Sequence, residues 1–267
     1  MIREIRINTM EGIEALIFDQ KRNEQNHRLR SPYYYRGMPD GSFDLSTSLA
    51  RNCGTLAGEL EMHLLENFIK YASIEDPTIS DSIWKAMILG QHHGLPTRLL
   101  DWTRSPLVAL HFADTEGDLS YLDQRDCVIW RIDVKELNEH LPEKYREALN
   151  RRKTFIFSVK HLAELTNSIE EYDRDMGGRS LVMIEPSSID QRIVSQYSFF
   201  TVLPKSIGKL EKYLEEETEN TVKYIIDRSL RWDLRDILDE LNMNERTIYP
   251  GLDGISKWIA RHYYVKR

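Results

Sequence analysis

The sequence predicts one α+β domain in which a mixed or antiparallel sheet is flanked by helices. Predicted strands and helices are interspersed along the chain without the regular alternation that is typical of a doubly wound parallel sheet. The 267 residues suffice for one large domain or two small ones, and no glycine- and serine-rich linker divides them. We therefore expect an N-terminal segment over residues 1–29 and a single domain over residues 30–267.

Short runs rich in aromatic and β-branched residues predict the strands. In the first, residues 31–37, three tyrosines precede Arg36, and Gly37 and the turn residues Pro39-Asp-Gly41 follow. Bounded apolar runs and alternating apolar residues are the signal for the later strands. These are expected at residues 127–134, 181–184, 198–203 and 222–226.

Amphipathic spacing and capping residues predict the helices. Residues 56–72 place apolar side chains on one helical face, and a second helix begins near Ser82 and must end before Pro96. Ser105 suits the N-cap of the next helix, and Pro106 suits its first position. Further helices are expected at residues 145–149, 234–241 and 252–263.

Composition restricts the partners. The formal net charge is −7, which argues against broad electrostatic binding to nucleic acid and allows it only through a local basic patch. No apolar run approaches the roughly 18 residues that span a bilayer, and the first residues lack the apolar core of a secretion signal. Cys53 and Cys127 are far apart and are expected to be reduced thiols. We therefore expect a cytoplasmic protein without a membrane partner.

Residues 91–113 are the most informative part of the chain. Within them, residues 92–104 place two histidines, two arginines, an aspartate and a tryptophan in a turn that ends at a helix start. The free N–H groups and the dipole of a helix that starts at Ser105 favour a phosphate, and Thr103 and Arg98 could add donors. This pattern predicts a site for an anionic ligand. A plain capped helix with surface arginines is an equally consistent interpretation.

His92, His93 and Asp101 are the ionisable candidates in this segment. Adjacent histidines on a helix point in different directions, and no further metal-ligand spacing accompanies them, so we expect no metal site. One histidine could orient a ligand or Asp101. If Asp101 is buried it must be paired, with Arg98, Arg36 or a histidine as its partner. Catalysis and a structural salt bridge are equally open for this aspartate.

Two other segments carry polar candidates. Arg36 could bind phosphate or carboxylate through its forked guanidinium, while a tyrosine such as Tyr35 stacks on a ring. Arg192 is a further candidate for ligand binding, and Gln196 can both donate and accept, which suits a sugar hydroxyl or an amide. No Walker phosphate loop, dinucleotide-binding glycine motif or Gly-x-Ser-x-Gly elbow is present.

Taken in order, these motifs resemble the FRG domain family, which is named for its aromatic-Arg-Gly signature. Tyr35-Arg36-Gly37 matches that signature, and Gln91-His-His-Gly-Leu-Pro-Thr-Arg-Leu-Leu-Asp-Trp-Thr103 is similar to the family's most specific motif. The departures are Thr47 where proline is usual and Ser198 where glycine is common. Weaker similarity to the family continues at residues 45–51, 109–113, 192–200 and 248–254.

A second resemblance, to ADP-ribosyltransferases, implies a mechanism by analogy alone. Those enzymes place an arginine on an early strand, a Ser-Thr-Ser strand before a helix, and a Glu or Gln on a late strand. Arg36, residues 101–103 and Gln196 stand in that order. Trp102-Thr103 replaces the serine pair, and no Glu-x-Glu is present. Glu185 could substitute for the missing glutamate.

The second resemblance implies that NAD is the cofactor. Arg36 and the helix start at Ser105 would bind the pyrophosphate, and Thr103 and Gln196 would hold the nicotinamide ribose. Asp101 or Glu185 would stabilise the positive charge that develops on the ribose. The chain would then be a toxin or phage-defence effector that modifies an unidentified macromolecular acceptor.

Two alternatives remain open at the level of sequence. One is a nuclease or other hydrolase that acts on a phosphorylated substrate with His92 or His93 as acid or base. The other is a non-enzymatic module for a ligand or a protein, in which the same polar residues are structural.

Overall fold

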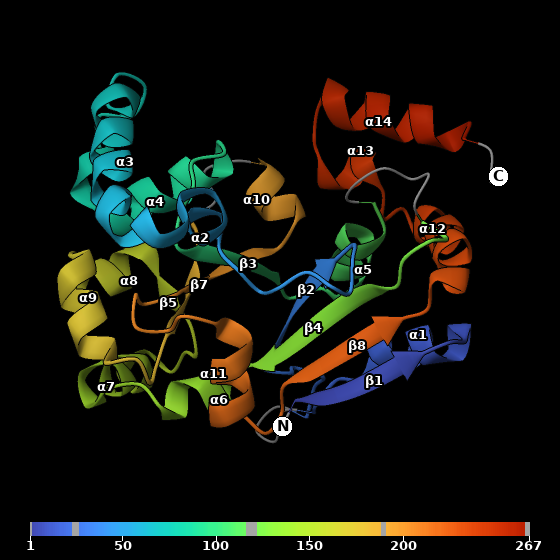
Figure 1. Ribbon diagram of the computed structural model, residues 1–267, viewed down its shortest axis with the longest axis horizontal. Helices are drawn as coiled ribbons and strands as arrows, with labels where there is room; N and C mark the ends of the chain where they lie inside the picture. The colour runs from blue at the N-terminus through green and yellow to red at the C-terminus, as the bar shows by residue number, and fades with distance from the viewer. Residues whose placement is uncertain (1, 23–26, 116–121, 188–190, 265–267) are drawn as a thin grey trace.

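A computed structural model describes residues 2–22, 27–115, 122–187 and 191–264. Its centre is an eight-stranded sheet in the order β1-β8-β4-β2-β3-β7-β6-β5 (Figure 1). The outer pairs β1–β8 and β5–β6 are parallel, and the pairs between them are antiparallel. The predicted α+β class with a mixed sheet is therefore confirmed. The strands are β1 (Arg3–Ile7), β2 (Tyr33–Met38), β3 (Leu99–Thr103), β4 (Cys127–Asp133), β5 (Phe157–Ser158), β6 (Val182–Glu185), β7 (Ser198–Val202) and β8 (Val222–Ile226).

Helices lie on both faces of this sheet, and the last three, α12 to α14, gather beside α5 at one end of the molecule (Figure 1). Those before β4 are α1 (Met10–Phe18), α2 (Ser48–Cys53), α3 (Ala57–Ala72), α4 (Ile83–His92) and α5 (Pro106–Thr115). Between β4 and β7 come α6 (Val134–Glu139), α7 (Glu143–Arg152), α8 (Val159–Leu165), α9 (Ile169–Met176) and α10 (Gln191–Ser195). The remainder are α11 (Leu210–Glu217), α12 (Arg231–Glu240), α13 (Glu245–Ile248) and α14 (Leu252–His262), and short 3-10 turns lie at Gly54–Leu56, Ile79–Asp81 and Arg228–Leu230.

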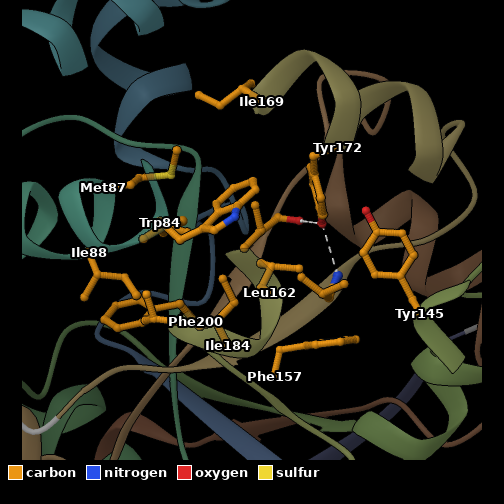
Figure 2. Packing of buried hydrophobic residues seen from close by; sticks show 14 of the residues in the cluster. Trp84, Met87, Ile88, Tyr145, Phe157, Leu162, Ile169, Tyr172, Ile184 and Phe200 are labelled. Carbon is orange, nitrogen blue, oxygen red and sulfur yellow. Dashed lines mark hydrogen bonds between the residues drawn. The ribbon is translucent and has the colours of Figure 1, made fainter. Parts of the chain in front are cut away.

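Two separate apolar clusters share one face of the sheet. The first packs α3, α4 and α7 to α9 against β5, β6 and β7, and Figure 2 shows its centre. There the rings of Trp84 and Tyr172 meet edge to face at 5.2 Å, and the Tyr172 hydroxyl donates to the main-chain oxygen of Val202 at 2.7 Å. The second cluster packs α1, α5 and α12 against β1, β2, β4 and β8. The opposite face is covered by α6 and α11.

The strand register explains why a polar strip separates these two clusters. Side chains alternate between the faces of a strand, so Leu99, Asp101 and Thr103 share a face. Leu99 belongs to the first cluster, whereas Thr103 pairs with Tyr35, which belongs to the second. Asp101 lies between them, where neither helical group covers the sheet. This uncovered strip is the place where a ligand could reach β2, β3 and β7.

Most expected elements form, with small shifts at their ends. The segment that contains Asp101 differs from the prediction, because residues 99–103 form the central strand β3 rather than a turn. Asp101 is not buried, since 57% of its side chain is exposed, and its ion-pair partner is Arg36. None of the helices in the described ranges has both the length and the apolar character needed to cross a membrane. Cys53 and Cys127 are both free thiols.

Candidate functional site

A cleft of about 150 Å³ opens over β2, β3 and β7. It brings together residues from three distant segments: β2, the continuous stretch of β3 and α5, and residues 192–198 of α10 and the start of β7. Polar side chains dominate its wall, including two arginines and one carboxylate. The lining residues are Tyr35, Arg36, Gly37, Asp101, Trp102, Thr103, Phe112, Arg192, Gln196 and Ser198.

The aromatic-Arg-Gly motif places three residues with different roles on β2. Tyr35 is buried in the core and its hydroxyl accepts a hydrogen bond from Gln20 at 3.1 Å. Gly37 lies against α5 so closely that a Cβ atom there would be 1.8 Å from the main-chain oxygen of Ala109. Tyr35 and Gly37 face α5, whereas the side chain of Arg36 between them turns away from α5 toward the neighbouring strand β3, where it contacts Asp101. The motif thus fixes a helix against a strand and positions an arginine at the cleft.

Arg36 is held by Asp101 on the neighbouring strand. Its Nη1 donates to the main-chain oxygen of Asp101 at 2.9 Å and lies 3.5 Å from Asp101 Oδ2. Only 20% of the Arg36 side chain is exposed, and its buried Nε has no hydrogen-bond partner among the described residues. An unsatisfied buried donor is uncommon in folded proteins. The guanidinium is therefore anchored at one nitrogen and incompletely satisfied at another.

Gln91 holds the other oxygen of the same carboxylate. Gln91 Nε2 donates to Asp101 Oδ1 at 3.0 Å, and Gln91 Oε1 accepts a hydrogen bond from the Thr97 hydroxyl. Asp101 is thus oriented from both sides, by Arg36 and by Gln91, while much of the carboxylate remains exposed to the cleft. A carboxylate that is charged, oriented and exposed can stabilise a cation or bind a hydroxyl donor.

Thr103 connects the central strand to the α10–β7 segment. Its hydroxyl donates to the main-chain oxygen of Gln196 at 2.8 Å and accepts from the N–H of Ser105 at 3.2 Å. The hydroxyl proton is therefore used within the protein and not directed at a ligand. Gln196 is followed by Tyr197, whose φ of 49° lies in the left-handed region that non-glycine residues rarely adopt. This turn presents the Gln196 side chain at the cleft, where its Nε2 lies 3.5 Å from the main-chain oxygen of Ile248.

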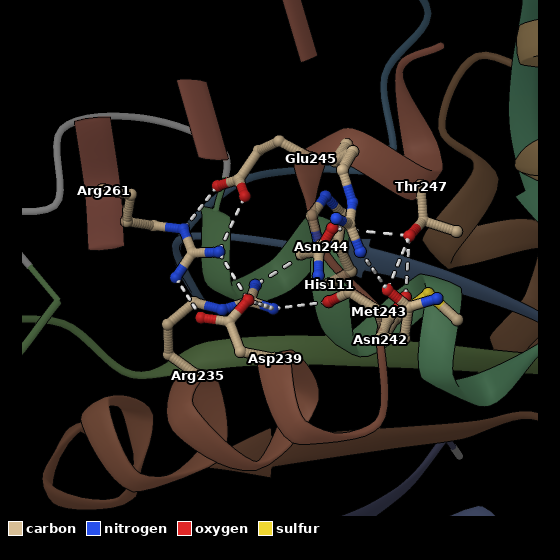
Figure 3. Close-up of polar contacts among 10 residues, drawn as sticks. His111, Arg235, Asp239, Asn242, Met243, Asn244, Glu245, Thr247 and Arg261 are labelled. Carbon is tan, nitrogen blue, oxygen red and sulfur yellow. Dashed lines mark hydrogen bonds and ion pairs between the residues drawn. The ribbon is translucent and has the colours of Figure 1, made fainter. Parts of the chain in front are cut away.

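The C-terminal helices adjoin the site, where the main-chain oxygen of Ile248 contacts Gln196, and are attached by buried charges (Figure 3). Arg261 of α14 makes paired hydrogen bonds to Glu245 at 2.6 and 2.7 Å and to Asp239 at 2.5 and 2.6 Å. Arg235 of α12 contacts His111 of α5 at 3.3 Å and donates to the main-chain oxygen of Met243 at 2.6 Å. Through these contacts, α13 and α14 are fixed relative to α5 and hence to the cleft.

Of the nine predicted site residues, six line the cleft and three do not. Those at the cleft are Tyr35, Arg36, Asp101, Thr103, Arg192 and Gln196. Tyr35 is only 1% exposed, so the aromatic face available to a ligand belongs to half-buried Phe112 instead.

Arg98, Ser105 and His92 lie outside the cleft lining. Arg98 is buried and forms ion pairs with Glu61 and Asp173, both at 2.5 Å, so it has a structural position instead of the predicted contact with a ligand. The Ser105 hydroxyl caps α5 by accepting from the N–H of Val108 at 3.3 Å.

His92, at the end of α4, packs edge to face on His93 at 5.1 Å. Neither ring lines the cleft, and it is Gln91, not a histidine, that orients Asp101. Glu185, the expected substitute carboxylate, is also absent from the lining. Across the described residues, no group of three or more His, Cys, Asp or Glu side chains is arranged to hold a metal ion.

The sequence reasoning did not identify Gln91 or Phe112 as parts of the site. Both lie in the segment 91–113 that drew attention, but amides and phenylalanines are common and neither has a diagnostic spacing. Gln91 lies ten positions before Asp101, and only the return of the chain from α4 into β3 brings the two together.

Comparison with known proteins gives one finding. Residues 31–120 match the model of the FRG domain family. Searches of curated proteins and of solved structures returned no match. The matched segment contains the cleft-lining parts of β2, β3 and α5, and also Gln91, which holds Asp101. The chain therefore contains an FRG domain, as the aromatic-Arg-Gly signature and the 91–103 motif predict.

Proposed function

We propose that the chain is a nucleotide-binding enzyme that transfers ADP-ribose from NAD to a macromolecular acceptor in the cytoplasm, as a toxin or phage-defence effector. The observation that supports this proposal is the convergence of Arg36, Asp101 and Gln196 from three remote segments in one cleft. Such convergence suits an anionic ligand with hydroxyl groups, because guanidinium groups bind phosphates while carboxylate and amide groups bind sugar hydroxyls. Two reduced thiols agree with a cytoplasmic location.

The reaction would proceed by displacement at the ribose. In NAD the bond from the ribose to nicotinamide breaks, its electron pair leaves with the nicotinamide nitrogen, and a lone pair of the acceptor forms the new bond. The acceptor's proton passes to solvent. When water is the acceptor, the same steps give hydrolysis.

Each polar group of the cleft has a role in this scheme. Arg36 and Arg192 would bind phosphate oxygens, and Gln196 would hold a ribose hydroxyl. Asp101, kept in orientation by Gln91 and Arg36, would stabilise the positive charge that develops on the ribose. Phe112 would pack against the nicotinamide ring. Thr103 has a positioning role in place of the ligand contact expected from sequence, since its hydroxyl holds Gln196.

Arg36→Ala tests the proposal. We expect the affinity for NAD to fall by about 10- to 100-fold, because a charge-assisted hydrogen bond contributes roughly 1.5–3 kcal/mol. Nicotinamide release should fall with it. Titration calorimetry and a nicotinamide assay measure the two effects. Arg146→Ala, at an exposed position on α7 away from the cleft, is the matched control and should behave like the parent. Absence of NAD binding by the parent protein would exclude the proposed function.

The hydrolase alternative has less support, because His92 and His93 lie outside the cleft lining. It predicts phosphodiester cleavage that is lost in His92→Ala or His93→Ala. On our proposal, both variants retain NAD binding and nicotinamide release within about twofold of the parent, which is less than about 0.5 kcal/mol.

A further inference from the structure

A ring outside the cleft lining connects the cleft to the C-terminal helix. Tyr249 follows α13, and its ring and that of Phe112 meet edge to face at 6.4 Å between ring centres. The guanidinium of Arg192, which lines the cleft, lies over the Tyr249 ring at 5.1 Å from its centre. The ammonium of Lys257, on α14, lies over the same ring at 5.5 Å. Tyr249 thus lies between the wall of the cleft and the first turns of α14.

The charges around this ring favour an anion. A tyrosine face attracts cations, but each such contact contributes only about 0.5–1 kcal/mol at exposed sites and leaves the net charge of the group unchanged. Two cations near one ring also repel each other. Lys257 is exposed, and within the described part of the chain it has no ion-pair partner. An anionic group beside Tyr249 would therefore relieve the repulsion and gain two cationic partners.

The size of the cleft indicates how much of a ligand it can hold and how much must extend toward Tyr249. Pockets that enclose a small organic ligand usually measure about 300–1,000 Å³, whereas this cleft has about 150 Å³. A cleft of this size holds only part of a dinucleotide. The remainder of such a ligand must continue outside the cleft. Arg192 indicates where it would continue, because its side chain both lines the cleft and lies over the Tyr249 ring.

We propose that Arg192, Tyr249 and Lys257 form a second anion subsite, which binds the distal phosphate of a diphosphate-containing ligand whose other end occupies the cleft. This inference rests on the proposed function and adds to it. It assigns a ligand-binding role to α14, a helix outside the segment that matches the FRG family. Discrimination between one and two phosphates would then depend on the C-terminal helices.

The test compares ligands with one and two phosphates. Titration calorimetry is carried out with NAD, nicotinamide mononucleotide and inorganic pyrophosphate on the full chain and on Lys257→Ala. We expect the variant to bind NAD and pyrophosphate about 5- to 20-fold more weakly and nicotinamide mononucleotide within twofold of the parent. Lys70→Ala is a closely matched control, because Lys70 lies over the ring of Tyr71 at 5.5 Å on α3, away from the cleft. It should leave all three affinities unchanged.

The outcomes separate this inference from the proposed function. If the parent binds NAD and Lys257→Ala binds it equally well, the second subsite is refuted while the NAD site stands. If the parent fails to bind NAD but binds pyrophosphate through Lys257, the subsite stands and the proposed enzyme does not. If the parent binds none of the three ligands, both are wrong.

Discussion

Gly37 shows how a single position in the family signature is determined by packing. Gly37→Ala should lower the free energy of unfolding by at least about 3 kcal/mol, because its Cβ would lie 1.8 Å from the main-chain oxygen of Ala109 and would force β2 and α5 apart. Denaturant unfolding measures the loss. Gly208→Ala is the control, since a Cβ there would meet nothing within 4 Å, and we expect a change below about 0.5 kcal/mol. Equal stability of the two variants would contradict this account of the signature.

Gln91 leads to a prediction about catalysis. In Gln91→Leu, Asp101 loses the amide that holds Oδ1 and can turn toward Arg36, so fewer molecules have the carboxylate in position. We expect kcat for nicotinamide release to fall about tenfold, equivalent to about 1.4 kcal/mol, with little change in KM. Asn67→Leu removes an exposed amide on α3 and serves as the control. A KM effect without a kcat effect would show that Gln91 acts on binding instead.

Sequence reasoning was most informative for residues whose chemistry is unusual at their position. Arg36, Asp101 and Gln196 could be selected because charged or amide side chains beside runs of apolar and aromatic residues are seldom needed for packing. Arg98 was misplaced because the sequence does not tell whether an arginine of this segment faces the cleft or the interior, and neither Arg98 nor Arg104 lines the cleft. Arg98 lies just before β3, where Glu61 and Asp173 from distant helices surround it. Such partners follow only from tertiary structure.

At the scale of the element, α14 depends on one arginine. Arg261→Met would leave the carboxylates of Asp239 and Glu245 without their shared cation, and breaking a buried ion pair costs about 3–5 kcal/mol. We expect the segment 245–262 to open locally, with faster amide hydrogen exchange there and little change in β2 to β4. The control Arg151→Met alters an exposed arginine on α7, away from α14. Unchanged exchange in Arg261→Met would show that apolar packing alone holds the helix.

The elements themselves were predicted with uneven success. Strands β4, β7 and β8 carry runs or alternations of apolar residues, and α3 and α4 have clear apolar faces, so their patterns were sufficient. Strand β3 was not recognised, because a central strand with an exposed aspartate breaks the apolar run that signals burial. The short helices α8 and α10 were not predicted, because five to seven residues make less than two helical turns and show too little of the apolar spacing that identifies a helix.

For the whole molecule, acid stability depends on two buried groups of α5. Burial, aided by the positive charge of Arg235, lowers the pKa of His111 to about 3, and burial raises the pKa of Asp114 to about 6. Below its ordinary pKa of 6.5, His111 takes up a proton in the unfolded chain but not in the folded one, so stability is lost as the pH falls. Asp114 has the opposite effect on stability between about pH 6 and 4, because over this range the folded protein binds a proton at Asp114 and the unfolded chain does not. The His111 shift is the larger, and we expect a net loss of stability.

His111→Gln should remove most of that loss. The free energy of unfolding of the variant should change little or rise between pH 7 and 4.5, whereas that of the parent falls. Denaturant melts across this range measure both slopes, and the exposed His63→Gln on α3 is the control. Parallel slopes for the parent and His111→Gln would mean that other groups determine acid stability.

The strand order also has an implication for how this architecture can be inherited. Of the eight strands, the span recognised by the family profile supplies β2 and β3, which are joined at Tyr35 and Thr103 and flanked by β4 and β7 from later in the chain. A gene fragment limited to that span would encode two barely paired strands with open edges and would be expected to aggregate instead of folding. Recombination that preserves the domain must therefore transfer a much longer stretch of coding sequence than the recognisable signature.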